Sequence, residues 1–220
     1  MLDTDPTKIV SHSLSDKAYT DYVVFENNIM SDRYIKSKIV DKSQSVVIGS
    51  SRFSNEWTKK LRLLMPVKDI LVKNSEVTKI VWFLSPEKYN VNLSETKRII
   101  KYISKFPNLS VIIKPHTRRN TMLDSNIKNP NIIIADESLH SPQLIDWTDL
   151  VMFTTTSVIF DALRRDKKIF YMKCLHSNTL LSEDYFKSWE IHSRDQFRDE
   201  LWKIIKDKSY RTYSKSDSKN

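Results

Sequence analysis

The segment 149–172, DLVMFTTTSVIFDALRRDKKIFYM, constrains the fold of this chain more than any other part of the sequence. A short apolar run, Leu150–Phe153, is typical of a buried strand and leads into four consecutive hydroxyl residues, 154–157. A helical pattern of apolar residues follows, and then a basic turn and a second apolar run, 169–172. The segment therefore predicts a strand, a hydroxyl-rich turn, a helix and a second strand, which is the repeating unit of a parallel α/β sheet.

The hydroxyl-rich turn of this unit is a candidate phosphate site. The first turn of a helix has free backbone N–H groups and the positive end of the helix dipole, and phosphate is their usual ligand. We predict that Thr155, Thr156 and Ser157 bind phosphate; capping of the helix by Thr156 or Ser157 is the simpler interpretation and is compatible with it. Asp161 lies one helical turn after Ser157 and is predicted to hold a ribose or sugar hydroxyl, the alternative being a surface ion pair with the arginines that follow.

The same alternation of strands and helices continues along most of the chain. It predicts an α/β fold, a doubly wound and Rossmann-like parallel sheet of about six strands. In such sheets ligands bind beyond the carboxyl ends of the strands, near the point where the strand order reverses. Strands are expected at 45–48, 79–84, 109–113, 131–135, 150–153 and 169–172, and helices at 55–65, 94–105, 141–147, 157–165 and 194–206.

Three regions are expected. Residues 1–43 are polar and weakly patterned, with a short strand at 23–25 and a helix at 33–40, and they form an N-terminal extension or the remnant of a preceding domain or linker. Residues 44–208 form the Rossmann-like nucleotide-binding domain. Residues 209–220 are rich in serine and lysine and are predicted to be a disordered tail.

The chain has a single glycine, Gly49. This excludes the glycine-rich fingerprints of dinucleotide-binding folds and of P-loop NTP-binding proteins. Gly49, Ser50 and Arg52 follow the first strand of the predicted domain, where a glycine lets the backbone approach a ligand. The forked guanidinium of Arg52 suits phosphate, so we predict that all three contribute to the site; an ordinary tight turn with a solvent-facing arginine is the alternative.

A basic loop follows the third strand of the predicted domain. Lys114, His116 and Arg118 are predicted to converge on an anion, since Pro115 fixes the chain as it leaves the sheet. His116 could also donate a proton to a leaving phosphate, which makes it the candidate catalytic residue. A basic surface loop without a ligand is the alternative. Glu137 follows the fourth strand and is predicted to line the pocket for a base.

Composition narrows the function further. One cysteine, Cys174, excludes an internal disulfide, and we predict that it is a buried structural thiol. The histidines lack the spacing of metal ligands, so we expect no metal and no cofactor apart from a nucleotide-activated donor. No apolar run reaches the roughly 18–20 residues of a membrane span, and the N-terminus is no signal peptide. A cytoplasmic setting fits these features.

The net charge of +9 has two interpretations. Most basic residues are interleaved with acidic ones, which favours a solvated, lysine-rich surface. The alternative is attraction to anionic partners, namely nucleotide-activated substrates or phospholipid headgroups at the inner face of the plasma membrane. No nucleic-acid-binding motif is present, so nucleic acid is not an expected partner.

Three stretches together, GSSRF..EW, KPHTRR and the segment 149–172, carry a family resemblance over residues 44–206. They resemble the C-terminal, donor-binding half of GT-B-type transferases that build bacterial surface polymers, above all the capsule polysaccharide and CDP-glycerol glycerophosphotransferase families. The resemblance implies a CDP-, UDP- or CMP-linked sugar or glycerol as donor. It also implies that Lys114 and His116, with Thr156 and Ser157, hold the donor phosphates and that Asp161 holds a sugar or ribose hydroxyl.

Such transferases have a second, N-terminal domain for the acceptor, and residues 1–43 are too short to form one. We therefore expect half of an enzyme: a fragment, one subunit of a split transferase, or a degenerate copy, whose acceptor domain is missing or is supplied by a partner chain. Two alternatives stay open. One is a non-catalytic nucleotide-sugar-binding subunit, and the other is a fragment of a GT-B-like sugar epimerase.

Overall fold

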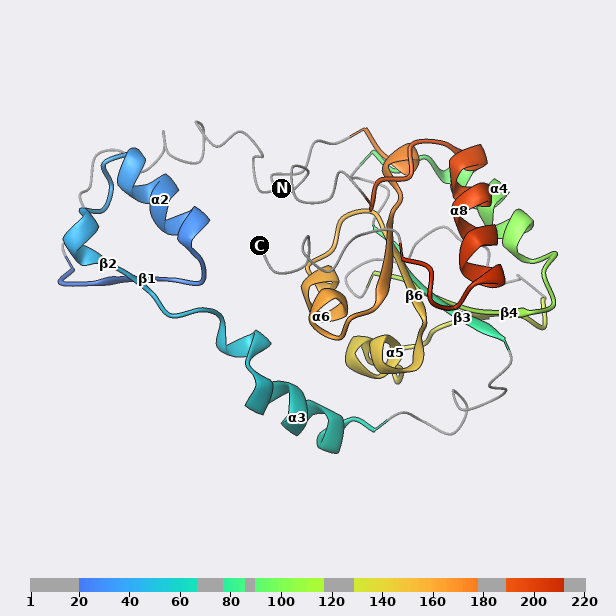
Figure 1. Cartoon of the computed structure of the whole chain (residues 1–220), viewed down its shortest axis with the longest axis horizontal. Helices are drawn as coiled ribbons and strands as arrows, with labels where there is room; N and C mark the ends of the chain where they lie inside the picture. The colour runs from blue at the N-terminus through green and yellow to red at the C-terminus, as the bar shows by residue number, and fades with distance from the viewer. Residues whose placement is uncertain (1–19, 67–76, 86–89, 117–128, 178–188, 212–220) are drawn as a thin grey trace. The chain divides into compact units, whose positions relative to one another are not determined.

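The computed structural model describes residues 20–66, 77–85, 90–116, 129–177 and 189–211. The chain divides into two compact units, Met1–Lys60 and Leu61–Asn220 (Figure 1). The predicted tail beyond residue 211 and the predicted site residue Arg118 lie outside the described residues.

The first unit contains one parallel pair of strands, β1 and β2, joined by helix α2. The helix begins five residues before the range predicted for it, because the Asn27 side chain caps it by accepting a hydrogen bond from the Met30 amide (2.9 Å). The strand expected at 45–48 pairs with β1, so its assignment to the larger sheet is wrong. The elements are β1 (Val23–Phe25), α2 (Asn28–Lys36), the 3₁₀ helix η1 (Lys42–Gln44), β2 (Ser45–Val47) and the 3₁₀ helix η2 (Ser51–Phe53).

The second unit contains a five-stranded sheet in the order β5-β4-β3-β6-β7, with every neighbouring pair parallel. This confirms the predicted α/β fold class, with five strands in the sheet rather than about six. Helix α3 (Asn55–Leu64) crosses the boundary between the units. The other elements are β3 (Thr78–Phe83), α4 (Leu93–Ile103), β4 (Leu109–Lys114), β5 (Ile132–Ile134), α5 (Ser141–Trp147), β6 (Leu150–Phe153), α6 (Val158–Arg164), β7 (Lys168–Tyr171), the 3₁₀ helix η5 (Lys173–Leu175) and α8 (Arg194–Lys206).

The sheet is covered on both faces. Helices α4 and α8 pack on one face and α5 and α6 on the other (Figure 1). Strand β3 shows why the strands are continuously apolar: Ile80 and Trp82 belong to the core under α4 and α8, and Val81 and Phe83 to the core under α5 and α6. Strands buried on both sides require apolar residues at every position.

The strand order reverses between β3 and β6. The chain proceeds from β3 to β4 and β5 in one direction, and then returns to place β6 and β7 on the other side of β3. Doubly wound folds bind their ligands beyond the carboxyl ends of the strands at such a reversal. The residues that directly follow these two strands are the first to consider as a site.

Local signals set several helix boundaries. Helices α5 and α8 and strand β6 have the bounds predicted from the sequence. Helix α4 begins at Leu93, one residue before the range predicted for it. Asn92 is the N-cap and accepts from the Glu95 amide (3.1 Å), whereas the Ser94 hydroxyl donates to the Asn92 side chain (3.0 Å). Of the described helices, none combines the length and the apolar character needed to cross a membrane.

Helix α8 offers a simple test of a cap. The Ser193 hydroxyl accepts a hydrogen bond from the Gln196 amide (3.1 Å). We expect Ser193→Ala to lower the free energy of unfolding by about 1 kcal/mol in urea denaturation, and Ser193→Asn to change it by only a few tenths. Equal losses in the two variants would show that the hydroxyl does not act as a cap.

Candidate functional site

Ser85 joins the carboxyl ends of β3 and β6. It lies two residues after the end of β3 and is 4% exposed. Its hydroxyl accepts hydrogen bonds from the Thr155 amide (3.0 Å) and the Thr154 hydroxyl. Its single hydrogen can go to the Thr155 carbonyl (3.0 Å) or to the Thr155 hydroxyl (2.6 Å). One buried serine thus fixes the backbone and side chains of the first half of the hydroxyl-rich turn.

The second half of this turn leads into α6. The Thr156 hydroxyl accepts from the Val158 amide at 3.3 Å, so part of the predicted capping falls to Thr156. Ser157 occupies the N-cap position with helical backbone angles (φ −71°, ψ −10°), and its side chain makes no capping hydrogen bond within the described structure. The Ser157 hydroxyl is exposed. The turn therefore presents a hydroxyl to solvent that the helix does not use, as a ligand-binding turn requires.

Asp161 is placed one turn further along α6. It is buried, at 8% exposure, beside the fully buried Ala162. Of the two arginines that follow, Arg165 pairs with Asp146 at 2.8 Å. The predicted role of Asp161 in holding a sugar or ribose hydroxyl, and the alternative of an ion pair with the arginines that follow, both stay predictions.

Lys114 ends β4 and is turned toward the end of β5. Its side chain is buried, and its ammonium group donates to the Asp136 carbonyl at 2.6 Å. Burial lowers the pKa of Lys114, and the nearby carboxylates of Asp136 and Glu137 partly oppose this shift. Glu137 is exposed, and His116 is half-buried. The roles predicted for these three residues stay predictions.

The structure brings the end of β4 next to the end of β3. The Leu84 amide donates to the Lys114 carbonyl at 3.0 Å, directly before Ser85. We define the carboxyl-edge site as Ser85, 114–116, 154–157 and Asp161. It combines hydroxyl groups, backbone N–H groups and two potential cations, and these groups suit a phosphate-bearing ligand.

Gly49, Ser50 and Arg52 lie in the first unit, whereas the carboxyl-edge site belongs to the second. Gly49 has a φ of +81°, in the region that glycine favours, which explains a glycine at this turn. The Ser50 hydroxyl donates to Glu26 (3.1 Å), and the Arg52 guanidinium lies 5.4 Å from the centre of the Phe53 ring. Their contribution to phosphate binding stays a prediction.

Sequence reasoning missed Ser85 as a site residue. The available signal was its position between an apolar strand and Pro86. Ser85 follows its strand just as the hydroxyl cluster follows β6. The role of Ser85 could be recognised only by knowing that β3 and β6 are neighbours, because this brings Ser85 to Thr154, 69 positions further along the chain. In the parts of the chain that the structure describes, no three His, Cys, Asp or Glu side chains are grouped as a metal site would need.

Cys174 is expected to react slowly. Burial, and to a lesser degree the charge of Glu95, raises the pKa of its thiol from 9.0 to about 11. Because the thiolate is the nucleophile, we expect alkylation by iodoacetamide at pH 8 to be roughly a hundredfold slower in the folded protein than in urea. Equal rates would contradict this. The unfolded thiol ionises first, so the stability from this group is present below pH 9 and is lost as the pH rises toward 11.

No family model matches the chain, and no curated protein matches it. Solved structures do match. The wall teichoic acid polymerase TagF superposes with a TM-score of 0.56 at 14% identity, over 94% of this chain and 55% of that one. The UDP-GlcNAc 2-epimerase of Methanocaldococcus jannaschii, in complex with UDP-GlcNAc and UDP, superposes with a TM-score of 0.60 at 14% identity. The superposition covers 90% of this chain and 59% of that one. The Neisseria meningitidis UDP-GlcNAc 2-epimerase bound to UDP-GlcNAc superposes with a TM-score of 0.60 at 13% identity, over 91% of this chain and 60% of that one.

These similarities show the fold. The chain has a GT-B-like architecture with a Rossmann-like parallel sheet. It spans between 55% and 60% of the length of these three structures. The identities of 13–14% are too low to carry an activity from any of these proteins to this one.

Proposed function

We propose that the chain is the donor-binding domain of a nucleotide-dependent glycosyl- or glycerophosphotransferase that acts in bacterial surface polysaccharide biosynthesis. The observation that carries this proposal is the hydroxyl cluster of Ser85, Thr154 and Thr155 at the point where the strand order reverses. Ligands of doubly wound sheets bind at this place. The likeness to a wall teichoic acid polymerase supports the choice of a transferase.

In this proposal the hydroxyl-rich turn holds the diphosphate of the donor. The hydroxyl and backbone N–H groups of Thr156 and Ser157 donate hydrogen bonds to phosphate oxygens, and Ser85 keeps the preceding residues in place. Such preorganised donors stabilise the charge that develops on the leaving nucleotide without reorganising during the reaction. His116 donates a proton to the leaving phosphate, and Lys114 adds positive charge at the same strand end.

The remaining predicted residues give the site its selectivity. Asp161, buried on α6, accepts hydrogen bonds from hydroxyl groups of the ribose or of the transferred sugar. Glu137 follows β5 and contacts the base. Acidic acceptors that pair with specific hydroxyls discriminate against analogues that lack those hydroxyls.

The acceptor is expected to bind elsewhere. The chain covers 55% of the teichoic acid polymerase structure, and we propose that a further domain or a partner chain provides the acceptor site. The purified chain should therefore bind nucleotide but cleave little CDP-glycerol or UDP-linked sugar. The measurement is chromatography of the free nucleotide that cleavage of the donor would produce. Rapid transfer by the chain alone would contradict the need for a second part.

A sugar epimerase is the second candidate, because two UDP-GlcNAc 2-epimerases superpose with TM-scores of 0.60. The two candidates differ in their products. Incubation with UDP-GlcNAc should leave the sugar unchanged if the chain is a transferase domain. Appearance of the C2 epimer would favour the epimerase and reject the transferase.

A further inference from the structure

Helix α3 is amphipathic, yet none of its ten residues is buried. At about 100° per residue, Trp57, Leu61 and Leu64 fall within an arc of about 60° around the helix. Trp57 is 40% exposed and Leu64 is 64% exposed, while Leu61 is half-buried. A helix normally packs such a stripe against a core. These three residues, the apolar face of α3, lie on the surface instead, and exposed apolar faces mark interaction sites.

The polar side of α3 is the side that is bonded to helix α5. The Arg62 guanidinium pairs with the Asp146 carboxylate at 3.1 Å. Two residues after the helix, the Pro66 carbonyl accepts a hydrogen bond from the Gln143 side chain (2.6 Å). Arg62 lies about 140° around the helix from Trp57. These bonds therefore hold α3 with its apolar face turned away from α5.

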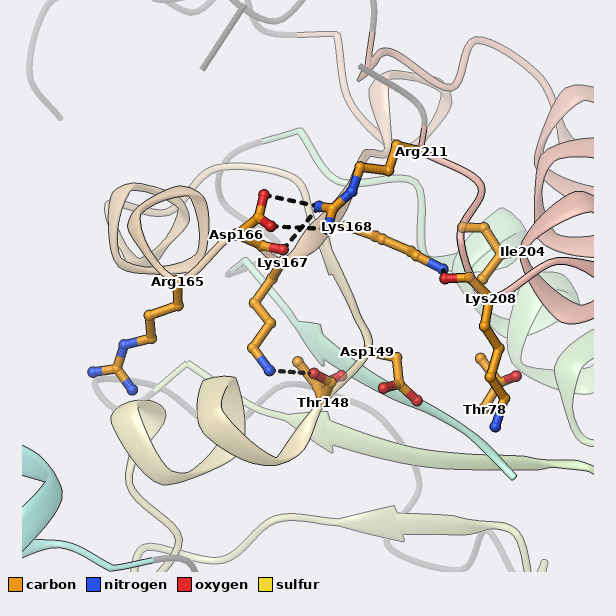
Figure 2. A pocket seen from close by; sticks show the side chains of 10 residues that line it. All are labelled: Thr78, Thr148, Asp149, Arg165, Asp166, Lys167, Lys168, Ile204, Lys208 and Arg211. Atoms are coloured by element: carbon orange, nitrogen blue, oxygen red, sulfur yellow. Dashed lines mark hydrogen bonds and ion pairs between the residues drawn. The ribbon is translucent and has the colours of Figure 1, made fainter. Parts of the chain in front are cut away.

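The two α5 residues that hold α3 are themselves fixed. Gln143 is 4% exposed. The Asp146 carboxylate also pairs with Arg165, which directly follows α6, at 2.8 Å. Figure 2 shows the Arg165 side chain pointing away from the other side chains that line the cavity beside β7. Arg165 thus supports the attachment of α3, and the outward direction of the apolar face is set by groups of the folded sheet domain.

Charge and residue type indicate what this face contacts. Helix α3 carries three basic residues and one acidic residue, Glu56, within a chain whose net charge is +9. Lys60 is exposed and lies about 40° from Leu64, at the border of the apolar face. A lysine in this position can extend its ammonium to lipid headgroups, and the amphipathic ring of tryptophan favours the interface between lipid and water. A second copy of the chain would bring two net charges of +9 together, which opposes pairing.

We propose that α3 binds to the surface of a membrane that contains anionic lipid, with its apolar face inserted at the level of the headgroups. A helix of ten residues is about 15 Å long and cannot cross a hydrocarbon core of about 30 Å, so it lies parallel to the surface. Such binding combines burial of the apolar face with attraction between basic residues and anionic lipid. No residue of α3 belongs to the carboxyl-edge site, so failure of nucleotide binding would leave this contact unaffected.

The test is sedimentation of the full chain with phosphatidylcholine vesicles, with and without phosphatidylglycerol. We expect binding to vesicles that contain phosphatidylglycerol and much weaker binding to phosphatidylcholine alone. Leu64→Gln should weaken binding about tenfold, because it removes apolar surface from the inserted face. Leu63→Gln is the matched control: Leu63 is 83% exposed and lies about 120° around the helix from Trp57, so this variant should bind as the wild type does.

A second pair of variants tests the charge at the border of the apolar face. Lys60→Gln should weaken binding to vesicles with phosphatidylglycerol about fivefold. Lys59→Gln makes the same change about 160° around the helix from Trp57, where the ammonium faces the solution, and should weaken binding no more than about twofold. The four substituted residues, 59, 60, 63 and 64, are exposed, so all variants should fold, which circular dichroism checks.

Two results would overturn the proposal in the vesicle assay: absence of binding to vesicles with phosphatidylglycerol, and equal losses in Leu64→Gln and Leu63→Gln. Sedimentation velocity without lipid examines the other occupant of the face. We expect a monomer at micromolar concentration in the wild type and in Leu64→Gln. A wild-type dimer that Leu64→Gln dissociates would show that the apolar face pairs two copies of the chain, and this too would overturn the proposal.

Discussion

Asp146→Ala is expected to lower the free energy of unfolding by about 3 kcal/mol, because it leaves a buried cation without its counter-charge. The Arg165 side chain is 3% exposed and contacts Asp146 at 2.8 Å. Its guanidinium also donates to the Pro142 carbonyl (2.9 Å), and its Nε and Nη2 atoms have no hydrogen-bond partner among the described residues. The Asp146→Ala variant also removes the ion-pair partner of Arg62, whose guanidinium lies 3.1 Å from the Asp146 carboxylate.

The measurement is equilibrium unfolding in urea, with Asp195→Ala as the matched control. Asp195 is 82% exposed and lies 3.5 Å from Arg198, so its removal should change stability by less than about 0.5 kcal/mol. Combining Asp146→Ala with Arg165→Met removes the stranded charge and should recover much of the loss. A loss below about 1 kcal/mol in Asp146→Ala would show that solvent compensates Arg165.

Ser85→Ala is expected to cost about 2 kcal/mol of stability, because it leaves the Thr154 hydroxyl and the Thr155 amide without their acceptor. The site is closed to compensating water, since Ser85 and Thr154 are 4% and 1% exposed. Ser104→Ala is the control. The hydroxyl of this more exposed serine donates to the Lys101 carbonyl (2.9 Å), and its removal should cost about 0.5 kcal/mol.

The Ser85 variant also separates a structural role from a positioning role. If the serine positions the phosphate-binding turn, Ser85→Ala should weaken nucleotide binding about tenfold under conditions where the protein remains folded. A stability loss with unchanged nucleotide affinity would show that Ser85 supports the sheet alone. Similar stability losses in Ser85→Ala and Ser104→Ala would contradict its place at the centre of the cluster.

The sequence was sufficient for the local structure of several elements. Helices α5 and α8 and strand β6 have the predicted bounds, because each is delimited by signals within a few residues: a proline at the start of α5, a serine N-cap before α8 and polar residues on both sides of β6. The alternation of these elements also predicted the parallel α/β sheet. Both depend on short-range patterns that single sequences carry.

The parts that could not be predicted depend on which strands are neighbours. The local pattern of strand β2 would suit either the large sheet or a pair with β1. In the structure β2 pairs with β1. Ser85 becomes the centre of the candidate site only because β6 lies beside β3. The sequence placed Lys114 at a strand end, but the direction of its ammonium toward the Asp136 carbonyl depends on the position of β5.

Calorimetric titration of the chain with CDP, UDP and CMP, in the wild type and in His116→Ala, tests the proposed donor site most directly. We expect one nucleotide to bind with micromolar affinity and its affinity to fall at least about tenfold in the variant. His192→Ala, which removes an exposed histidine paired with Glu190 at 3.0 Å, should bind as the wild type does. Absence of binding by the wild type, or equal affinities in wild type and His116→Ala, would contradict a nucleotide site at the carboxyl edge of the sheet.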